Sequence, residues 1–105
     1  MKETTVEELK KKKDSGDTFT LLDVRESHEV FISKIEGGTL IPLDDLSGRM
    51  AELNKEDEVV VMCRSGARSA QACELLEKNG FENVSNLKGG VNEWAKKIDT
   101  SLPVY

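Results

Sequence analysis

The chain has 105 residues, of which 37% are hydrophobic and 33% are charged, a composition typical of a soluble globular domain and unlike that of a disordered or fibrous chain. Its 15 basic and 20 acidic residues give a formal net charge of -5, which disfavours nucleic-acid binding and attachment to an acidic membrane surface. No apolar run approaches the roughly 20 residues that span a bilayer, and the first residues lack the apolar core of a signal peptide, so we expect a cytoplasmic protein.

The amino-terminal third predicts two helices separated by a buried strand. Thr5 and Glu8 have the spacing of a capping box, so a helix should run over residues 5–14. Residues 19–24 are dense enough in apolar side chains to form a strand that is covered on both faces. A short helix should follow over residues 27–32.

The middle of the chain predicts a second strand and a further helix. The strand is expected at residues 39–41, directly before Pro42, which cannot donate a hydrogen bond to a sheet. The helix should begin near residue 44, because Leu46, Met50 and Leu53 recur at helical spacing. These apolar side chains should face the core.

The clearest strand in the sequence covers residues 58–62, where three consecutive valines favour a pleated strand buried on both faces. Its carboxyl end leads into Cys63. A helix over residues 69–79, a short strand over 84–86 and a last helix over 91–98 should follow. Strands that alternate with helices predict an open, mostly parallel α/β sheet.

The segment that carries chemistry lies between the valine-rich strand and the next helix. Its residues are Cys63, Arg64, Ser65, Gly66, Ala67, Arg68 and Ser69. A thiol that precedes a helix and lies near two guanidinium groups should ionise more readily than a free cysteine, so Cys63 is a candidate nucleophile. Gly66 should let the loop curl into a nest of backbone amides, while Arg64 and Arg68 should attract an anionic substrate.

This segment and three others resemble the rhodanese family of sulfurtransferases, and all four occur in the family's order and spacing. The other three are residues 22–26 with Glu29, residues 41–43 and residues 87–94. The resemblance implies a single domain over residues 1–105 with a rhodanese-like, open, mostly parallel sheet of about five short strands and helices on both faces. It also implies that Cys63 takes a sulfane sulfur from a donor such as thiosulfate, forms a persulfide and passes the sulfur to cyanide or a thiol.

We expect the loop from Arg64 through Ser69 to be the substrate-binding cradle. By the same resemblance, the amides of residues 64–68 hold the persulfide, and Arg64 and Arg68 help to bind sulfonate oxygens. We expect Asp23, Arg25 and Glu29 to form a polar network under the loop that orients Arg68. No metal or organic cofactor is implied. The expected partners are a small anionic, thiosulfate-like donor and a thiol acceptor such as thioredoxin or a sulfur-relay protein, with no nucleic acid and no membrane.

Three other functions stay open. One is a persulfide carrier for a dedicated protein partner. Another is a noncatalytic rhodanese-like docking module, which the retention of Cys63 disfavours. The third is a cysteine phosphatase or arsenate reductase, in which five residues separate the cysteine from the arginine, whereas four residues separate Cys63 from Arg68 here.

Several residues have a simpler structural interpretation. Cys73 should lie in the core on the apolar face of its helix, with a disulfide to Cys63 as the alternative. Trp94 and Phe31 are expected in the core, and His28 on a solvated helix surface.

Overall fold

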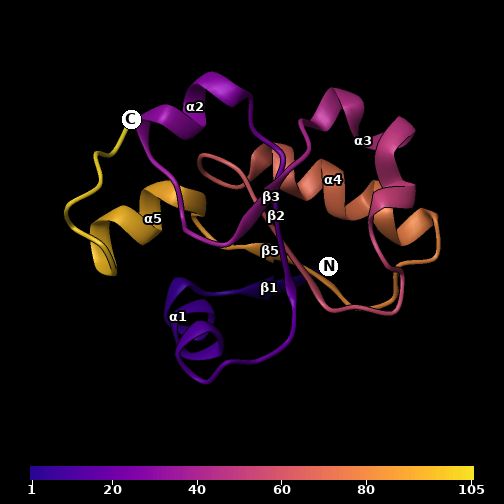
Figure 1. Cartoon of the computed structure of the whole chain (residues 1–105), viewed down its shortest axis with the longest axis horizontal. Helices are drawn as coiled ribbons and strands as arrows, with labels where there is room; N and C mark the ends of the chain where they lie inside the picture. The colour runs from indigo at the N-terminus through magenta and orange to yellow at the C-terminus, as the bar shows by residue number, and fades with distance from the viewer.

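One sheet of five strands organises the computed structural model, which describes all 105 residues. The strands are β1 (Lys2–Thr4), β2 (Thr20–Asp23), β3 (Gly38–Leu40), β4 (Val59–Met62) and β5 (Val84–Leu87). They lie in the order β1-β5-β4-β2-β3, and every neighbouring pair is parallel. The predicted open parallel sheet is therefore confirmed (Figure 1). The strand order places β4 at its centre.

Helices cover both faces of this sheet, as predicted (Figure 1). They are α1 (Val6–Asp14), α2 (Ser27–Ile32), α3 (Leu43–Arg49) with the 3-10 turn η1 (Met50–Glu52), α4 (Ala67–Lys78) and α5 (Gly90–Lys97). One apolar cluster joins the sheet to α3 and α4, and the other joins it to α1 and α5. None of these helices combines the length and the apolar character that crossing a bilayer requires.

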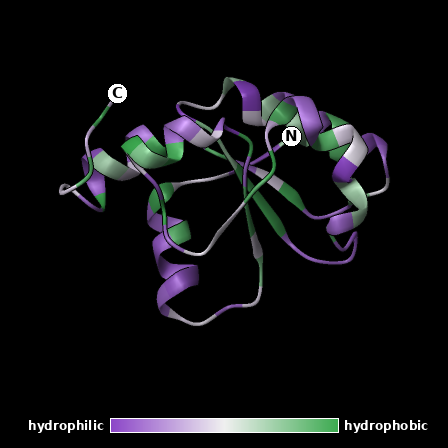
Figure 2. Ribbon diagram, turned by 45° about the horizontal axis from the view of Figure 1, so that its top comes forward, coloured by the Kyte–Doolittle hydropathy of each residue, from purple (hydrophilic) through white to green (hydrophobic).

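β4 supplies side chains to both apolar clusters. Val59 and Val61 face the α3 and α4 side, whereas Val60 and Met62 face the α1 and α5 side. All four residues are buried, which explains why the strand is apolar at every position rather than at alternate ones. Figure 2 shows hydrophobic residues along the central strands, whereas the helices contain both hydrophobic and hydrophilic residues.

The helix after the loop begins two residues earlier than the sequence predicted. Gly66 adopts a φ of 121° and is the N-cap, so α4 starts at Ala67. Arg68, which was expected in the loop, and Ser69, which was expected to begin the helix, are therefore the second and third residues of α4. The capping box of α1 is present as predicted, because the Glu8 amide donates to Thr5 Oγ1 at 3.1 Å and the Thr5 amide donates to Glu8 Oε1 at 2.9 Å.

β1 has no clear signal in the sequence. Its three residues are polar and only Thr4 is buried. The strand forms because it pairs with β5 at the edge of the sheet, where the Thr4 and Ser85 hydroxyls lie 2.7 Å apart although they are 81 residues apart in the chain. A pairing partner so distant cannot be recognised from the local pattern.

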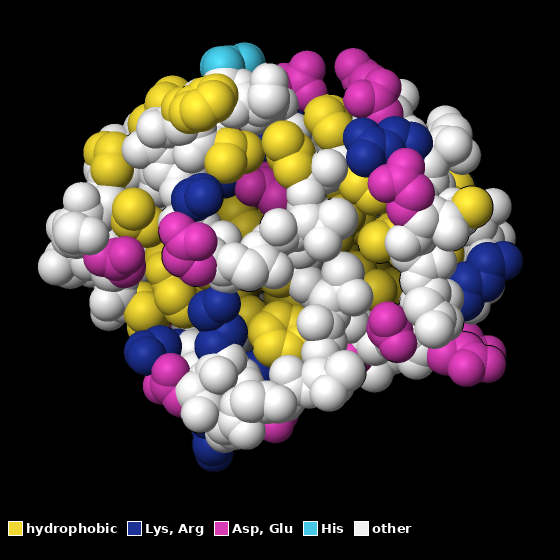
Figure 3. Space-filling model, viewed as in Figure 1, with side chains coloured by type: hydrophobic (Ala, Val, Ile, Leu, Met, Phe, Trp, Pro, Cys, Tyr) yellow, Lys and Arg dark blue, Asp and Glu magenta, His cyan; other side chains and the backbone are white.

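The prediction that Phe31 lies in the core is wrong, because its side chain is 91% exposed. The six-residue helix α2 buries only Glu29, so Phe31 and Ile32 stay at the surface. Figure 3 shows apolar side chains gathered over this helix beside the single histidine, His28, which is exposed as predicted. Trp94 is 6% exposed and packs in the core, as expected.

Candidate active site

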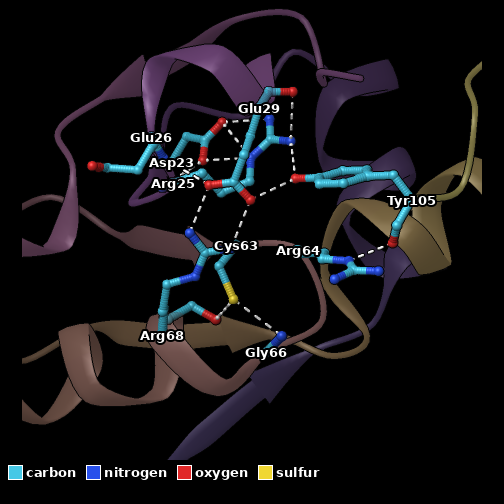
Figure 4. Close-up of polar contacts among 10 residues, drawn as sticks. Asp23, Arg25, Glu26, Glu29, Cys63, Arg64, Gly66, Arg68 and Tyr105 are labelled. Carbon is cyan, nitrogen blue, oxygen red and sulfur yellow. Dashed lines mark hydrogen bonds and ion pairs between the residues drawn. The ribbon is translucent and has the colours of Figure 1, made fainter. Parts of the chain in front are cut away.

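Cys63 directly follows β4, at the point where the carboxyl end of the strand meets the amino-terminal end of α4. Its side chain is only 1% exposed. The Gly66 amide donates to Cys63 Sγ at 3.1 Å (Figure 4). Ser69 Oγ lies 3.3 Å from the same sulfur. The sulfur is therefore enclosed by hydrogen-bonding groups from the loop and the first turn of α4.

These contacts favour the ionised thiol. Burial raises the pKa of the Cys63 thiol, but hydrogen bonds from the Ser69 hydroxyl and from the amides of Ser69, Gly66 and Ser65 outweigh burial. The net result is a pKa below the ordinary cysteine value. The positive end of the α4 dipole acts in the same direction. Since the thiolate is the nucleophilic form of cysteine, the site can supply a nucleophile without a neighbouring base.

Asn86 on β5 binds both the loop and the first turn of α4. Its Nδ2 donates to the Gly66 carbonyl at 3.0 Å, so its Oδ1 accepts from the Ser69 hydroxyl at 2.5 Å. While the Ser69 hydroxyl donates its proton to Asn86 Oδ1, the Cys63 thiol can donate to Ser69 Oγ. When the thiol ionises, the Ser69 hydroxyl can turn its proton to the sulfur, so one hydroxyl serves both protonation states.

The first turn of α5 fixes the other side of the loop. The Val91 amide donates to the Cys63 carbonyl at 2.9 Å, and the Asn92 amide donates to the Arg64 carbonyl at 3.1 Å. Because a trans peptide group directs its carbonyl and its amide to opposite sides, binding the Arg64 carbonyl turns the Ser65 amide toward the sulfur.

Gly90 makes this close approach of α5 possible. A Cβ atom at this position would lie 2.5 Å from the carbonyl oxygens of both Cys63 and Arg64, and the residue has a φ of 61°. Any larger side chain would collide with main-chain atoms of the loop. The structure thus gives a physical reason for the second glycine of the pair in the segment 87–94.

Asp23, Arg25 and Glu29 lie beside the loop in two ion pairs. Arg25 is fully buried and its Nη2 donates to Asp23 Oδ2 at 2.7 Å, while its Nε bonds both carboxylate oxygens. Arg68 binds Glu29 in a bidentate pair, with distances of 2.7 and 2.8 Å. The structure therefore brings together the residues expected to orient Arg68, and the direct partner among them is Glu29 (Figure 4).

Tyr105 connects the two ion pairs and was not recognised from the sequence. Arg25 Nη1 donates to the Tyr105 hydroxyl at 2.9 Å, and this hydroxyl donates to Glu29 Oε1 at 3.0 Å. The hydrogen bonds from Arg68 lower the pKa of Glu29 most, and with the Glu26 amide and Tyr105 they outweigh burial and place this pKa at about 2. The carboxylate is therefore ionised at any pH near neutrality.

The expected binding residues fall into two groups. Ser65, Gly66 and Ser69 present donors to the sulfur. The side chains of Arg64 and Arg68 instead bind Tyr105 and Glu29, and Ala67 is exposed and makes no bond to the sulfur. Two contributors were missed, Asn86 and Tyr105. The polar pair of Ser85 and Asn86 within the short predicted strand could have drawn attention to Asn86, whereas nothing near Tyr105 indicates its position.

Cys73 lies in the apolar cluster on the α3 and α4 side of the sheet, as predicted. It is 0% exposed, and both cysteines are free thiols. Burial raises the pKa of Cys73 to about 12, so this thiol is neutral and unreactive. The structure thus gives no support to a disulfide between Cys73 and Cys63.

Comparison with known families agrees with this architecture. The family model described as "Rhodanese-like domain" matches residues 5–97. The chain belongs to the rhodanese-like family. This match includes all four segments that resemble the family in the sequence.

Two relatives and one solved structure match nearly the whole chain. YtwF of Bacillus subtilis, named as a candidate sulfurtransferase, is 37% identical over 90% of this chain and 90% of its own length. YrkF of the same organism, named as a candidate sulfur carrier protein, is 38% identical over 92% of this chain, but this chain spans only 52% of YrkF. The solved structure of the human single-domain sulfurtransferase TSTD1 has a TM-score of 0.82 and 27% identity, and covers 92% of this chain and 97% of that one.

We predict that Gly90→Ala displaces the loop, because its Cβ would collide with the Cys63 and Arg64 carbonyls. The expected loss in the free energy of unfolding is about 3 kcal/mol, measured by urea denaturation. Gly48→Ala is the matched control, since no atom lies within 4 Å of its added Cβ. It lies within helix α3, so this change should stabilise the protein by roughly 0.5 to 1 kcal/mol. Equal stability of the Gly90→Ala variant and the parent would contradict the packing described.

We predict that Glu29→Gln destabilises the protein at pH 7 but much less in acid. The Glu29 pKa of about 2 lies below its unfolded value, so its ionisation stabilises the fold above pH 4.5 and loses effect as pH falls toward 2. The difference from the parent should be about 3 kcal/mol at pH 7 and less than half of that near pH 3, from urea midpoints.

The matched control for this pH series is Glu52→Gln, which removes an exposed ion pair with Arg49. Its effect should stay below about 1 kcal/mol at both pH values. A Glu29→Gln difference that does not change between pH 7 and pH 3 would show that the Glu29 carboxylate does not stabilise the fold as an ion.

Proposed function

We propose that this chain is a sulfurtransferase that carries a sulfane sulfur as a persulfide on Cys63. The single observation that carries the proposal is the buried sulfur, 1% exposed, with main-chain and hydroxyl donors around it and a lowered pKa. Such a site suits a singly charged sulfur atom better than a large substrate. The rhodanese-like family and the names of the relatives support the same class of reaction.

In the first half-reaction, the Cys63 thiolate attacks the outer sulfur of a donor such as thiosulfate. A bond forms between Sγ and the outer sulfur, and the bond between the two thiosulfate sulfurs breaks. Sulfite leaves with the electron pair of that bond, so no proton or redox partner is needed. The product is a Cys63 persulfide anion, and the total charge is unchanged.

In the second half-reaction, an acceptor removes the outer sulfur of the persulfide. Cyanide attacks that sulfur, the sulfur–sulfur bond breaks, and the electron pair returns to Sγ, which gives thiocyanate and the Cys63 thiolate. A thiol acceptor in its thiolate form reacts in the same way and gives its own persulfide. The donors of Ser65, Gly66 and Ser69 should hold the anionic intermediate between the two steps.

A persulfide carrier for a protein partner is the second candidate, and it uses the same Cys63 chemistry. It is favoured by the positions of Arg64 and Arg68, which bind other groups of the protein and leave no guanidinium directed at the sulfur. The pairing of Arg68 with Glu29 also argues against a phosphatase, which needs a free arginine for the phosphoryl oxygens. The physiological donor and the thiol acceptor, a thioredoxin or a sulfur-relay protein, stay predictions.

We predict that Cys63→Ser lowers thiocyanate formation from thiosulfate and cyanide by at least about a hundredfold, because a hydroxyl cannot form the persulfide. After incubation with thiosulfate alone, intact-mass analysis should show one added sulfur atom on the parent and none on Cys63→Ser.

Cys73→Ala is the matched control, because this second thiol lies in the core and is neutral. It should keep both the turnover and the added sulfur. A parent that gains sulfur from a protein persulfide but not from thiosulfate would favour the carrier over the thiosulfate enzyme. A parent that gains no sulfur from either donor would overturn the proposed function.

A further inference from the structure

Tyr105 reaches the candidate site from outside the part of the chain that the family model matches. That match covers residues 5–97. The Tyr105 hydroxyl lies between Arg25 and Glu29, and its main-chain oxygen accepts a hydrogen bond from Arg64 Nε. Its ring also lies against Arg64, with 5.1 Å between the guanidinium carbon and the ring centroid. One residue thus contacts both the network beside the loop and the first arginine of the loop.

Arg64 is the natural candidate to attract an anion to Cys63, because it is the next residue in the chain and is exposed. It is also the one arginine that pairs with no side-chain carboxylate, since the other arginines bind Asp23, Glu52 and Glu29. Figure 4 shows its side chain extending toward Tyr105 and away from Cys63 Sγ.

The position of Tyr105 is fixed independently of Arg64. The Tyr105 amide donates to Asn92 Oδ1 at 3.1 Å, and Asn92 Nδ2 donates to the Tyr105 main-chain oxygen at 2.9 Å. Asn92 lies in the first turn of α5, and its amide binds the Arg64 carbonyl. Anchored at its main chain and at its hydroxyl, Tyr105 presents a fixed ring face and a fixed oxygen to the Arg64 side chain.

We infer that Tyr105 is a positioning residue that holds the Arg64 guanidinium outside the anion cradle, the group of donors from Ser65, Gly66 and Ser69 around Cys63 Sγ. Tyr105 thereby disfavours the binding of small sulfonate donors. A doubly charged donor such as thiosulfate then meets backbone amides and the Ser69 hydroxyl, without a cation in the cradle. A persulfide presented by a larger thiol compound or a protein needs no such cation, because its transferable sulfur carries at most one charge. This inference rests on the proposed function and narrows its donor class.

The test measures thiosulfate binding to protein that cannot react, so it does not depend on turnover. In a Cys63→Ser background, the amide resonance of Gly66 is followed by NMR during thiosulfate titration at constant ionic strength. Adding Tyr105→Ala should lower the dissociation constant roughly threefold to fivefold, because it removes the ring face that holds the Arg64 guanidinium through an exposed cation–π contact, while the main-chain oxygen of residue 105 stays in place. Adding Arg64→Ala to that variant should remove the gain.

Three further variants show whether the tighter thiosulfate binding comes from loss of the Tyr105 ring face. Tyr105→Phe keeps the ring and should not produce the tighter binding, whereas Tyr105→Leu keeps apolar bulk without the ring face and should produce it. Val104→Ala truncates the neighbouring side chain, which is 50% exposed, and should leave the dissociation constant unchanged. Structural damage from a substitution would weaken thiosulfate binding. Tighter thiosulfate binding that is lost when Arg64 is replaced therefore means that the Arg64 side chain has been released.

The inference is overturned if Tyr105→Ala and Tyr105→Leu leave thiosulfate binding unchanged or weaken it. It is also overturned if the gain persists without Arg64, or if no variant shows a saturable shift of the Gly66 amide. These outcomes are separate from failure of the proposed function, which is judged by sulfur loading of the parent Cys63.

Discussion

The candidate active site depends on the hydrogen bonds that bind the carbonyls of the loop after Cys63, because these bonds fix the direction of the loop amides. Amides in the first turn of α5 bind the carbonyls of Cys63 and Arg64, and Asn86 binds the carbonyl of Gly66. With the Arg64 carbonyl bound outside the loop, the Ser65 amide at the other end of that peptide group faces the sulfur. A small buried sulfur can then be surrounded by donors that need no rearrangement when charge develops on it.

The charged side chains around the loop act at a greater distance from the sulfur. Glu29 neutralises Arg68, and Asp23 neutralises Arg25, so the fully buried guanidinium of Arg25 has the partner that burial requires. Tyr105 joins the two pairs through a single hydroxyl. The stabilisation of a thiolate on Cys63 therefore comes mainly from oriented dipoles, and the ion pairs fix the frame that holds those dipoles.

The parts of the fold that the sequence predicted are those specified by neighbouring residues. β4 follows from its valine run, the α1 cap from Thr5 and Glu8, and the position of Cys63 from a strand followed by a helix. A local interpretation was wrong at Phe31, which was expected in the core. No other element of the fold covers this side of the six-residue helix α2, so the Phe31 side chain stays exposed.

Long-range contacts explain the remaining omissions. Asn86 and Tyr105 act on a loop that lies about twenty and forty residues earlier in the chain. β1 likewise exists only through its pairing with β5. In each of these places the sequence shows an ordinary polar or terminal residue, and its role appears only when the sheet order places it beside its partner.

The central claim is that the loop donors keep Cys63 ionised more readily than an ordinary thiol, and its pKa in the folded protein tests this most directly. The 13C chemical shift of the Cys63 Cβ can be followed by NMR from pH 5 to pH 10, which needs no reagent to reach the buried sulfur. We predict a midpoint below the ordinary value of about 8.5, while Cys73 shows no titration in this range. A Cys63 midpoint at or above about 9 would mean that burial outweighs the loop donors, and would contradict the account.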